Sequence, residues 1–118
     1  MFEIKVNTDF SAAHNLRDYK GKCEKLHGHN WAVEAVFRYS KLDGSGLAVD
    51  FRIARGALKD AVEELDHSYL NELKPFKNTN PTSENIARFI FNIVKKKIKN
   101  IYSVAVWENE RSCAVYYE

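Results

Sequence analysis

The chain has 118 residues, of which 45% are hydrophobic and 29% are charged. This composition is typical of one folded domain rather than a disordered chain, and we expect residues 1–118 to form that domain. The net charge of +2 is too small to favour nucleic-acid binding, and the basic run 95–99 fits a helix end better than a phosphate-binding patch. The first residues alternate charge and hydrophobe, so we expect neither a signal peptide nor a membrane span. We therefore expect a cytosolic protein whose two cysteines are free thiols.

Two segments with a period of two predict the first pair of strands. In residues 2–10 the even positions are mainly hydrophobic and the odd positions are polar, as in a strand with one buried face. His14 follows this strand after three small residues. Residues 15–22 are polar and read as a loop. In residues 27–39 the odd positions carry two histidines and then hydrophobic side chains, so this strand begins with histidines and continues as core.

Two helices and a second pair of strands follow. Asp50 is a suitable N-cap for a helix that continues to Asp66, and Asn80-Pro81-Thr82-Ser83-Glu84 predicts a helix start with proline in the first turn. Residues 69–79 lack a clean period and are expected to form a loop. The last β-rich runs are residues 101–107 and 113–117, joined by a hairpin turn over 108–111.

The order strand, strand, helix, helix, strand, strand predicts an α+β fold. We expect a four-stranded antiparallel sheet with two helices on one face. Such a small sheet has two exposed edges, and exposed edges are normally covered or paired. We therefore expect the subunits to associate through the sheet.

The histidines stand at the ends of predicted elements. His27 and His29 are two residues apart on one strand, so their side chains project to the same face. If the first two strands are neighbours, His14 supplies a third imidazole. Three imidazoles with an open fourth position are typical of catalytic zinc, whereas structural zinc is usually closed by four protein ligands. Cys23 is either a further ligand or a reactive thiol beside the metal, and the residues alone leave both open.

Three other positions are candidates for chemistry. Asp66 and His67 are adjacent: either the imidazole interacts with a helix dipole, or the aspartate orients an imidazole that exchanges protons. Glu108 shares its strand parity with hydrophobic residues, so an acid falls on an otherwise apolar face. Either its carboxylate only forms hydrogen bonds within the fold at a strand end, or it binds the guanidine-like edge of a ligand through two parallel hydrogen bonds. Cys113 has no evident partner and is expected to be a core thiol.

Several short motifs together resemble one family. They are Phe10-Ser11-Ala12-Ala13-His14, Cys23-x-x-x-His27-Gly28-His29-Asn30, Asp50-Phe51, Asp66-His67, Pro81-Thr82-Ser83-Glu84-Asn85 and Glu108. In this order, and over essentially the whole length, the chain resembles the 6-pyruvoyltetrahydropterin synthase and 6-carboxytetrahydropterin synthase family. The resemblance implies the tunnelling fold, in which three subunits close a barrel and two trimers stack into a homohexamer. It also implies active sites at subunit interfaces, with the relay histidine and the cysteine from different subunits.

The implied activity is that of a zinc-dependent lyase acting on 7,8-dihydroneopterin triphosphate. One branch of the family stops at the pyruvoyl product, and the other loses triphosphate and acetaldehyde to form 6-carboxytetrahydropterin, a precursor of modified tRNA bases such as queuosine. We expect the carboxytetrahydropterin branch. By position, the implied zinc ligands are His14, His27 and His29, and the implied catalytic residues are Cys23, Asp66 and His67. The expected substrate contacts are Glu108, Thr82, Ser83 and Glu24.

Glu24 leaves a second product open. Some relatives carry a glutamate three residues before the first histidine of His-Gly-His and cleave the dihydroneopterin side chain toward folate-type pterins. In this chain Glu24 stands there, directly after Cys23, so both bases are present. The intact set of Cys23, Asp66 and His67 favours the cysteine-dependent reaction. A rival of another class is a non-catalytic zinc-binding or pterin-binding protein on the same fold, which would not need that set.

Overall fold

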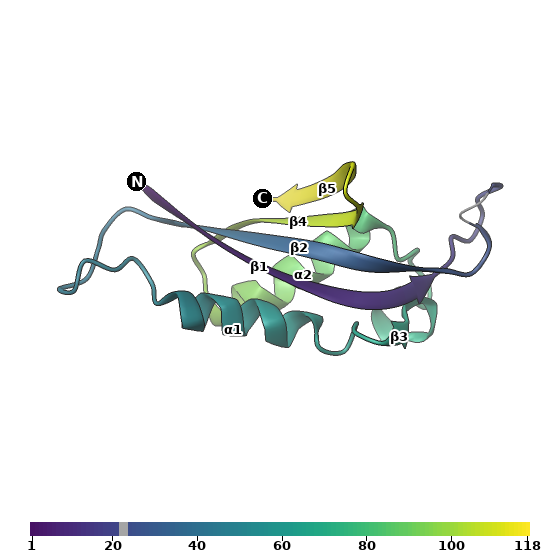
Figure 1. Cartoon of the computed structure of the whole chain (residues 1–118), viewed down its shortest axis with the longest axis horizontal. Coiled ribbons are helices and arrows are strands. Elements are labelled where there is room, and N and C mark those ends of the chain that lie inside the picture. The colour runs from purple at the N-terminus through teal and green to yellow at the C-terminus, as the bar shows by residue number, and fades with distance from the viewer. Residues whose placement is uncertain (22–23) are drawn as a thin grey trace.

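A computed structural model describes residues 1–21 and 24–118, and Figure 1 shows its arrangement. Two long strands are followed by a helix, a short irregular stretch, a second helix and two further strands. The irregular stretch contains two single-turn 3-10 helices, over Leu70–Glu72 and Lys74–Phe76. The other elements are β1 (Phe2–His14), β2 (His27–Tyr39), α1 (Phe51–Val62), β3 (Ser68–Tyr69), α2 (Ser83–Lys97), β4 (Ile101–Asn109) and β5 (Ser112–Tyr117).

The strands form one sheet in the order β3-β1-β2-β4-β5. The expected α+β class and the four antiparallel strands are confirmed, but the sheet has one addition. The two residues of β3 pair in parallel with β1, with Ala12 opposite Ser68, so the sheet is mixed and has five strands. A two-residue strand is too short to show a period, which is why the sequence predicted a loop there. β1 also runs to His14, so this histidine belongs to the strand instead of following it.

Both helices lie on the same face of the sheet (Figure 1), as predicted. The side chain of Asp50 caps α1 by accepting a hydrogen bond from the backbone N–H of Arg52. The helix ends at Val62, four residues earlier than predicted. The chain then turns, because the N–H groups of Leu65 and Asp66 both donate to the carbonyl of Val62, and this turn brings Leu65 into the core.

The second helix starts close to the predicted position. Thr82 is its N-cap and accepts a hydrogen bond from the backbone N–H of Asn85 at 3.1 Å. Pro81 is therefore the residue before the N-cap. The prediction that it lies in the first turn of the helix was wrong. Three lysines occupy the last turn, where positive charge complements the helix dipole as predicted.

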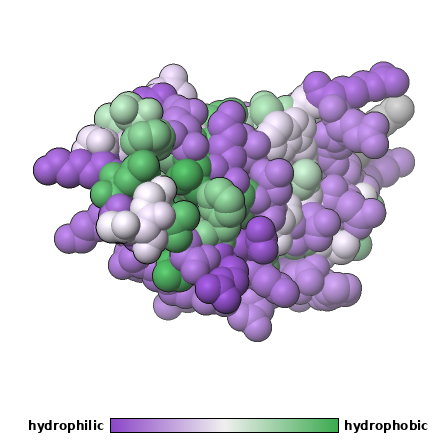
Figure 2. All heavy atoms as spheres, turned by 60° about the vertical axis from the view of Figure 1, so that its left-hand side comes forward, coloured by the Kyte–Doolittle hydropathy of each residue, from purple (hydrophilic) through white to green (hydrophobic). Residues whose placement is uncertain are grey.

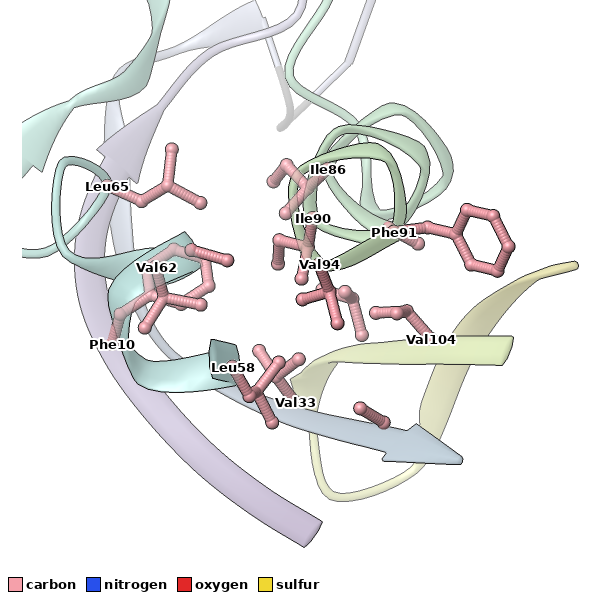
Figure 3. Close-up of a cluster of buried hydrophobic side chains, with 14 of the residues drawn as sticks. Phe10, Val33, Leu58, Val62, Leu65, Ile86, Ile90, Phe91, Val94 and Val104 are labelled. Atoms are coloured by element: carbon pink, nitrogen blue, oxygen red, sulfur yellow. The ribbon is translucent and has the colours of Figure 1, made fainter. Parts of the chain in front are cut away.

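One hydrophobic core lies between the sheet and the helices. Alternate residues of each long strand face the helices, and the hydrophobic stripes of α1 and α2 face the strands. The rings of Phe10 and Trp31 stack with their centroids 5.8 Å apart. Figure 3 shows strand and helix side chains meeting in this layer, with Phe10, Val33 and Val104 from the strands and Leu58, Val62, Ile90, Phe91 and Val94 from the helices.

Some hydrophobic side chains and one cysteine lie on the surface instead of in the core. Hydrophobic side chains gather at the end of the molecule that is brought forward in Figure 2. The exposed apolar residues of the β2–α1 connection and the start of α1 are Leu42, Leu47, Phe51 and Ile53. Cys113 on β5 is exposed, so its prediction as a core thiol was wrong. In the described part of the chain, neither helix is both long and apolar enough to cross a membrane.

We predict that Ile90→Ala lowers the free energy of unfolding by about 2–5 kcal/mol, because it removes buried methylene groups and leaves a cavity. Ile90 is 0% exposed, on the inner face of α2. The matched control is Ile53→Ala, since Ile53 is 60% exposed on α1. Urea denaturation of both variants measures the difference. Equal losses would contradict the placement of the core between the helices and the sheet.

Candidate metal centre and active site

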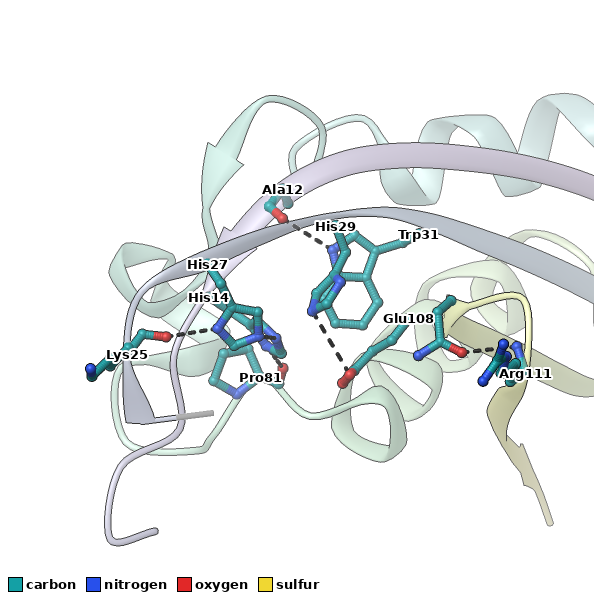
Figure 4. Close-up of polar contacts among 10 residues, drawn as sticks. Ala12, His14, Lys25, His27, His29, Trp31, Pro81, Glu108 and Arg111 are labelled. Carbon is teal, nitrogen blue, oxygen red and sulfur yellow. Dashed lines mark hydrogen bonds and ion pairs between the residues drawn. The ribbon is translucent and has the colours of Figure 1, made fainter. Parts of the chain in front are cut away.

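Three histidines converge at one end of the β1–β2 pair. The antiparallel register places His14 directly opposite His27, and alternation along β2 places His29 on the same face. The Nε2 atoms of His14 and His27 are 3.0 Å apart. One ligand nitrogen from each of the three rings lies within 4.8 Å of the others, and Figure 4 shows the rings turned toward one another.

Backbone carbonyls orient two of the rings. His14 Nδ1 donates to the carbonyl of Pro81, and His27 Nδ1 donates to the carbonyl of Lys25, each at 2.7 Å. A ring that donates from Nδ1 carries its lone pair on Nε2, so both rings present Nε2 as a ligand atom. His29 Nε2 is buried and has no hydrogen-bond partner among the described residues. A buried nitrogen without a partner is the atom that a bound cation would satisfy.

Burial favours the neutral form of two of these imidazoles, those of His14 and His29. Burial lowers the pKa of His14, which is 1% exposed, against the opposing effect of its hydrogen bond to the Pro81 carbonyl. Burial also lowers the pKa of His29, and this outweighs the opposite effect of the Glu108 carboxylate. Trp31 contacts both rings edge-on, with centroid distances of 4.9 Å to His14 and 5.2 Å to His29. Neutral imidazole is the form that binds a metal.

The donor set fits zinc. Zn–N bonds of about 2.0–2.1 Å in a tetrahedral site separate neighbouring ligand nitrogens by roughly 3.3 Å, which is close to the spacing of His14 and His27. Three imidazoles leave a fourth position open, which is typical of catalytic zinc. The sequence left open whether Cys23 closes the site, and Cys23 lies outside the described residues.

Asp66 and His67 do contact each other, although they are adjacent in the chain. His67 has a backbone φ of 57°, and its Nδ1 lies 3.1 Å from Asp66 Oδ2. The backbone N–H of Ser11 donates to Asp66 Oδ1 at 2.9 Å, and the N–H of His67 donates to the Ser11 carbonyl at 2.6 Å. These contacts hold the pair against the end of β1. The hydrogen bond from Ser11 is the main reason that the pKa of Asp66 lies below its ordinary value.

This pair and the histidine cluster open to opposite faces of the sheet. His67 lines an open cavity together with Ser11, Gly28 and Asn30, and His29 also borders this cavity. Gly28 and Asn30 alternate with the metal-facing histidines along β2, so they project to the other face. The side chain of His67 is 82% exposed there. Within one subunit the structure therefore does not bring His67 to the three imidazoles.

The predicted pterin contacts fall into two groups. Glu108 lies in β4 and not in the turn as predicted, and its Oε2 is 3.9 Å from His29 Nε2. Glu108 and Ser83 line one cavity of about 250 Å³ together with Cys113. Thr82 is not among the lining residues, and its hydroxyl is used to cap α2. Glu24 is exposed, and its N–H donates to the Gly21 carbonyl at 3.2 Å.

Sequence reasoning missed the groups that orient the ligands. The carbonyls of Pro81 and Lys25 carry no side-chain signal, because any residue type offers a backbone carbonyl. Trp31 was predicted only as core, yet its ring also lies against two of the imidazoles. Its Nε1 donates to the Ala12 carbonyl at 3.2 Å, which fixes the ring.

Fold and site together define a class of protein: an α+β subunit with three histidines, at the end of the sheet, that could hold a metal ion. The family model for 6-pyruvoyl tetrahydropterin synthase matches residues 3–118, and the chain belongs to this family.

Two relatives and one solved structure illustrate the similarity. A protein of Archaeoglobus fulgidus, provisionally named a 6-carboxy-5,6,7,8-tetrahydropterin synthase, is 39% identical over 91% of this chain and 88% of its own. The 6-carboxy-5,6,7,8-tetrahydropterin synthase of Synechocystis is 33% identical over 99% of this chain and 94% of its own. The structure of the 6-pyruvoyl tetrahydropterin synthase of Caenorhabditis elegans superposes with a TM-score of 0.90 at 26% identity, covering 99% and 95% of the two chains.

We predict that Asp66→Asn destabilises the fold at pH 7 and that the loss disappears in acid. The pKa of Asp66 is depressed in the folded chain, so its carboxylate stabilises the fold above the unfolded value of about 3.9. That contribution is lost as the pH falls from there through the folded pKa. Urea denaturation at pH 7 and pH 3 measures it. The control is Asp9→Asn, a change at an exposed residue of β1. A pH-independent loss for Asp66→Asn would contradict the assignment.

Proposed function

We propose that this protein is a zinc-dependent synthase of the 6-carboxy-5,6,7,8-tetrahydropterin type. It converts 7,8-dihydroneopterin triphosphate with loss of triphosphate and acetaldehyde. The observation that carries the proposal is the convergence of three imidazoles, one of which has a buried Nε2 without a hydrogen-bond partner among the described residues. The family supplies the pterin class, and the names of the two relatives favour the carboxytetrahydropterin product.

His14, His27 and His29 hold the zinc in this proposal. When bound, zinc polarises oxygens of the substrate side chain and makes the neighbouring carbon-bound protons more acidic. The carbonyls of Pro81 and Lys25 keep two ligand rings in the metal-binding tautomer. The edge of Trp31 keeps water from the buried side of the rings.

Cys23 and the Asp66–His67 pair move protons. The Cys23 thiolate removes a proton from the side-chain carbon of the substrate. The Asp66 carboxylate faces His67 Nδ1, so it holds the ring in the tautomer with Nε2 free. His67 then exchanges its proton through Nε2, which points into solvent space.

Glu108 anchors the pterin. Its carboxylate offers two acceptor oxygens, which match the paired N–H donors of an aminopyrimidine edge. Ser83 shares the cavity with Glu108 and makes a further polar contact with the pterin. Thr82 makes a lesser contact from the start of α2, and Glu24 contacts the substrate beside the base.

A homohexamer, arranged as a dimer of trimers, completes the active site in this proposal. The described contacts of His67 are to Asp66 and Ser11 and not to the three imidazoles, which supports the proposal that a second subunit brings a relay pair to each metal centre. Two further features support association. The first part of β1 has no strand neighbour on its outer side in the described chain, and hydrophobic side chains are exposed at one end of the molecule.

We predict that His27→Ala loses stoichiometric zinc, because two imidazoles cannot hold the ion with comparable affinity. The matched control is Lys25→Ala, which shortens the neighbouring side chain but keeps the backbone carbonyl that accepts from His27. Zinc per subunit, measured by elemental analysis after dialysis, distinguishes them. Full zinc retention by His27→Ala would rule out the three-histidine site.

We predict that the wild-type protein forms 6-carboxytetrahydropterin and acetaldehyde from dihydroneopterin triphosphate, and that Cys23→Ala keeps its zinc but loses this turnover. Separation and mass measurement of the products test both statements. Pyruvoylpterin as product would move the protein to the other family branch. Zinc and pterin binding without any turnover would make it a binding protein.

The paired variant Glu24→Gln separates the two possible bases. If Cys23 is the base, Glu24→Gln retains carboxytetrahydropterin formation. If Glu24→Gln loses activity while Cys23→Ala keeps it, and hydroxymethylpterin appears from unphosphorylated dihydroneopterin, the base is Glu24 and the proposed role of Cys23 fails.

A further inference from the structure

A buried asparagine takes the place of a strand neighbour where β1 ends. Asn71 is 7% exposed, and both the oxygen and the nitrogen of its carboxamide form hydrogen bonds with the backbone of Asn15. The N–H of Asn15 donates to Asn71 Oδ1 at 3.0 Å, and Asn71 Nδ2 donates to the Asn15 carbonyl at 2.8 Å. Two bonds of this kind fix the backbone of Asn15, the residue that follows His14.

The side chain of Asn15 makes two further contacts that join distant parts of the chain. Its Oδ1 accepts a hydrogen bond from the hydroxyl of Tyr69, two residues after His67. Its Nδ2 donates to the carbonyl of Glu24 at 3.3 Å. Asn15 therefore connects the end of β1, the segment after His67 and the returning side of the loop that leads to His27.

The outgoing side of the same loop is held independently. The N–H of Arg17 donates to Asn80 Oδ1 and Asn80 Nδ2 donates to the Arg17 carbonyl, each at 2.9 Å. The Arg17 guanidinium donates to the carbonyls of Asn71 and Phe76 at 3.1 and 2.8 Å. Loss of the Asn15 side chain would therefore leave the outgoing side in place and release only its contacts with Glu24 and Tyr69.

We infer that Asn15 is a positioning residue, which sets the place of Glu24, the chain neighbour of the proposed base, relative to His14 and the segment after His67. This inference rests on the proposed function. Proton transfer from carbon requires the base to lie within hydrogen-bond reach of its target, and a displacement of about 1 Å costs up to roughly a hundredfold in rate. The Asn15 amide is the described side-chain donor that reaches Glu24 across this loop.

The variant Asn15→Asp separates positioning from folding. Aspartate has the shape of asparagine and still accepts from the Tyr69 hydroxyl, so the contact to the fold is kept. It has no donor for the Glu24 carbonyl, and its carboxylate repels that oxygen. The reverse change is Tyr69→Phe, which removes the hydroxyl and leaves the Asn15 amide facing Glu24.

We expect kcat for Asn15→Asp to fall about ten- to hundredfold, with KM, zinc content and Tm unchanged. The kcat of Tyr69→Phe should fall less than the kcat of Asn15→Asp. Hydrogen–deuterium exchange of the peptide covering residues 24–26 should become faster in Asn15→Asp. The control is Asn78→Asp, the same chemical change at an exposed asparagine for which the described part of the chain shows no hydrogen bond.

Wild-type kcat and wild-type exchange in Asn15→Asp would overturn the inference. A fall in kcat that merely follows a loss of zinc would overturn it too, because Asn15 would then act through the neighbouring ligand His14. If the wild-type protein leaves dihydroneopterin triphosphate unchanged, the proposed function fails. The exchange comparison then decides by itself whether Asn15 holds Glu24.

Discussion

The antiparallel register of β1 and β2 is the constraint on which the rest of the structure depends. The two strands pair over 13 residues, from Phe2 opposite Tyr39 to His14 opposite His27. Because side chains alternate with a period of two, a slip of one residue would turn His27 and His29 to the opposite face and expose Trp31. The hydrophobic core therefore determines the register, and the register brings His14, His27 and His29 to one face.

The burial that stabilises the core also favours the neutral form of two of the candidate metal ligands, His14 and His29. Trp31 is fully buried between the helices and the sheet, and its edge forms the wall against which His14 and His29 stand. Desolvation there disfavours the imidazolium and lowers the pKa of both histidines. Hydrogen bonds from Nδ1 then leave Nε2 free in His14 and His27. The pairing of two strands thus forms a candidate metal site, and backbone carbonyls hydrogen-bond two of its three rings.

Polar side chains organise the rest of the site where no regular element can. Asn71 and Asn80 each make two hydrogen bonds to the backbone of the loop after β1, as a neighbouring strand would. Ser11 holds Asp66 and His67 at the edge of the same strand through its backbone. The metal centre and the acid–histidine pair are thus both fixed to β1, on opposite faces, and our proposal of a shared site between subunits follows from this arrangement.

The sequence by itself determined the class of fold, the long strands, both helix starts and the three metal-facing histidines, because periodicity and capping are local properties. It misplaced the end of α1, missed β3 and predicted Cys113 as core. Only the tertiary structure decided those points. Each residue of β3 pairs with a residue of β1 that is 56 positions away, and the exposure of Cys113 depends on β5 lying at the sheet edge. The tertiary structure also decided which face His67 occupies, which carbonyls orient the ligand rings, and that Asn15 faces Glu24. The Pro81 carbonyl is far from His14 in the chain, and the Lys25 carbonyl, although close to His27, carries no side-chain signal, so no local pattern records these contacts.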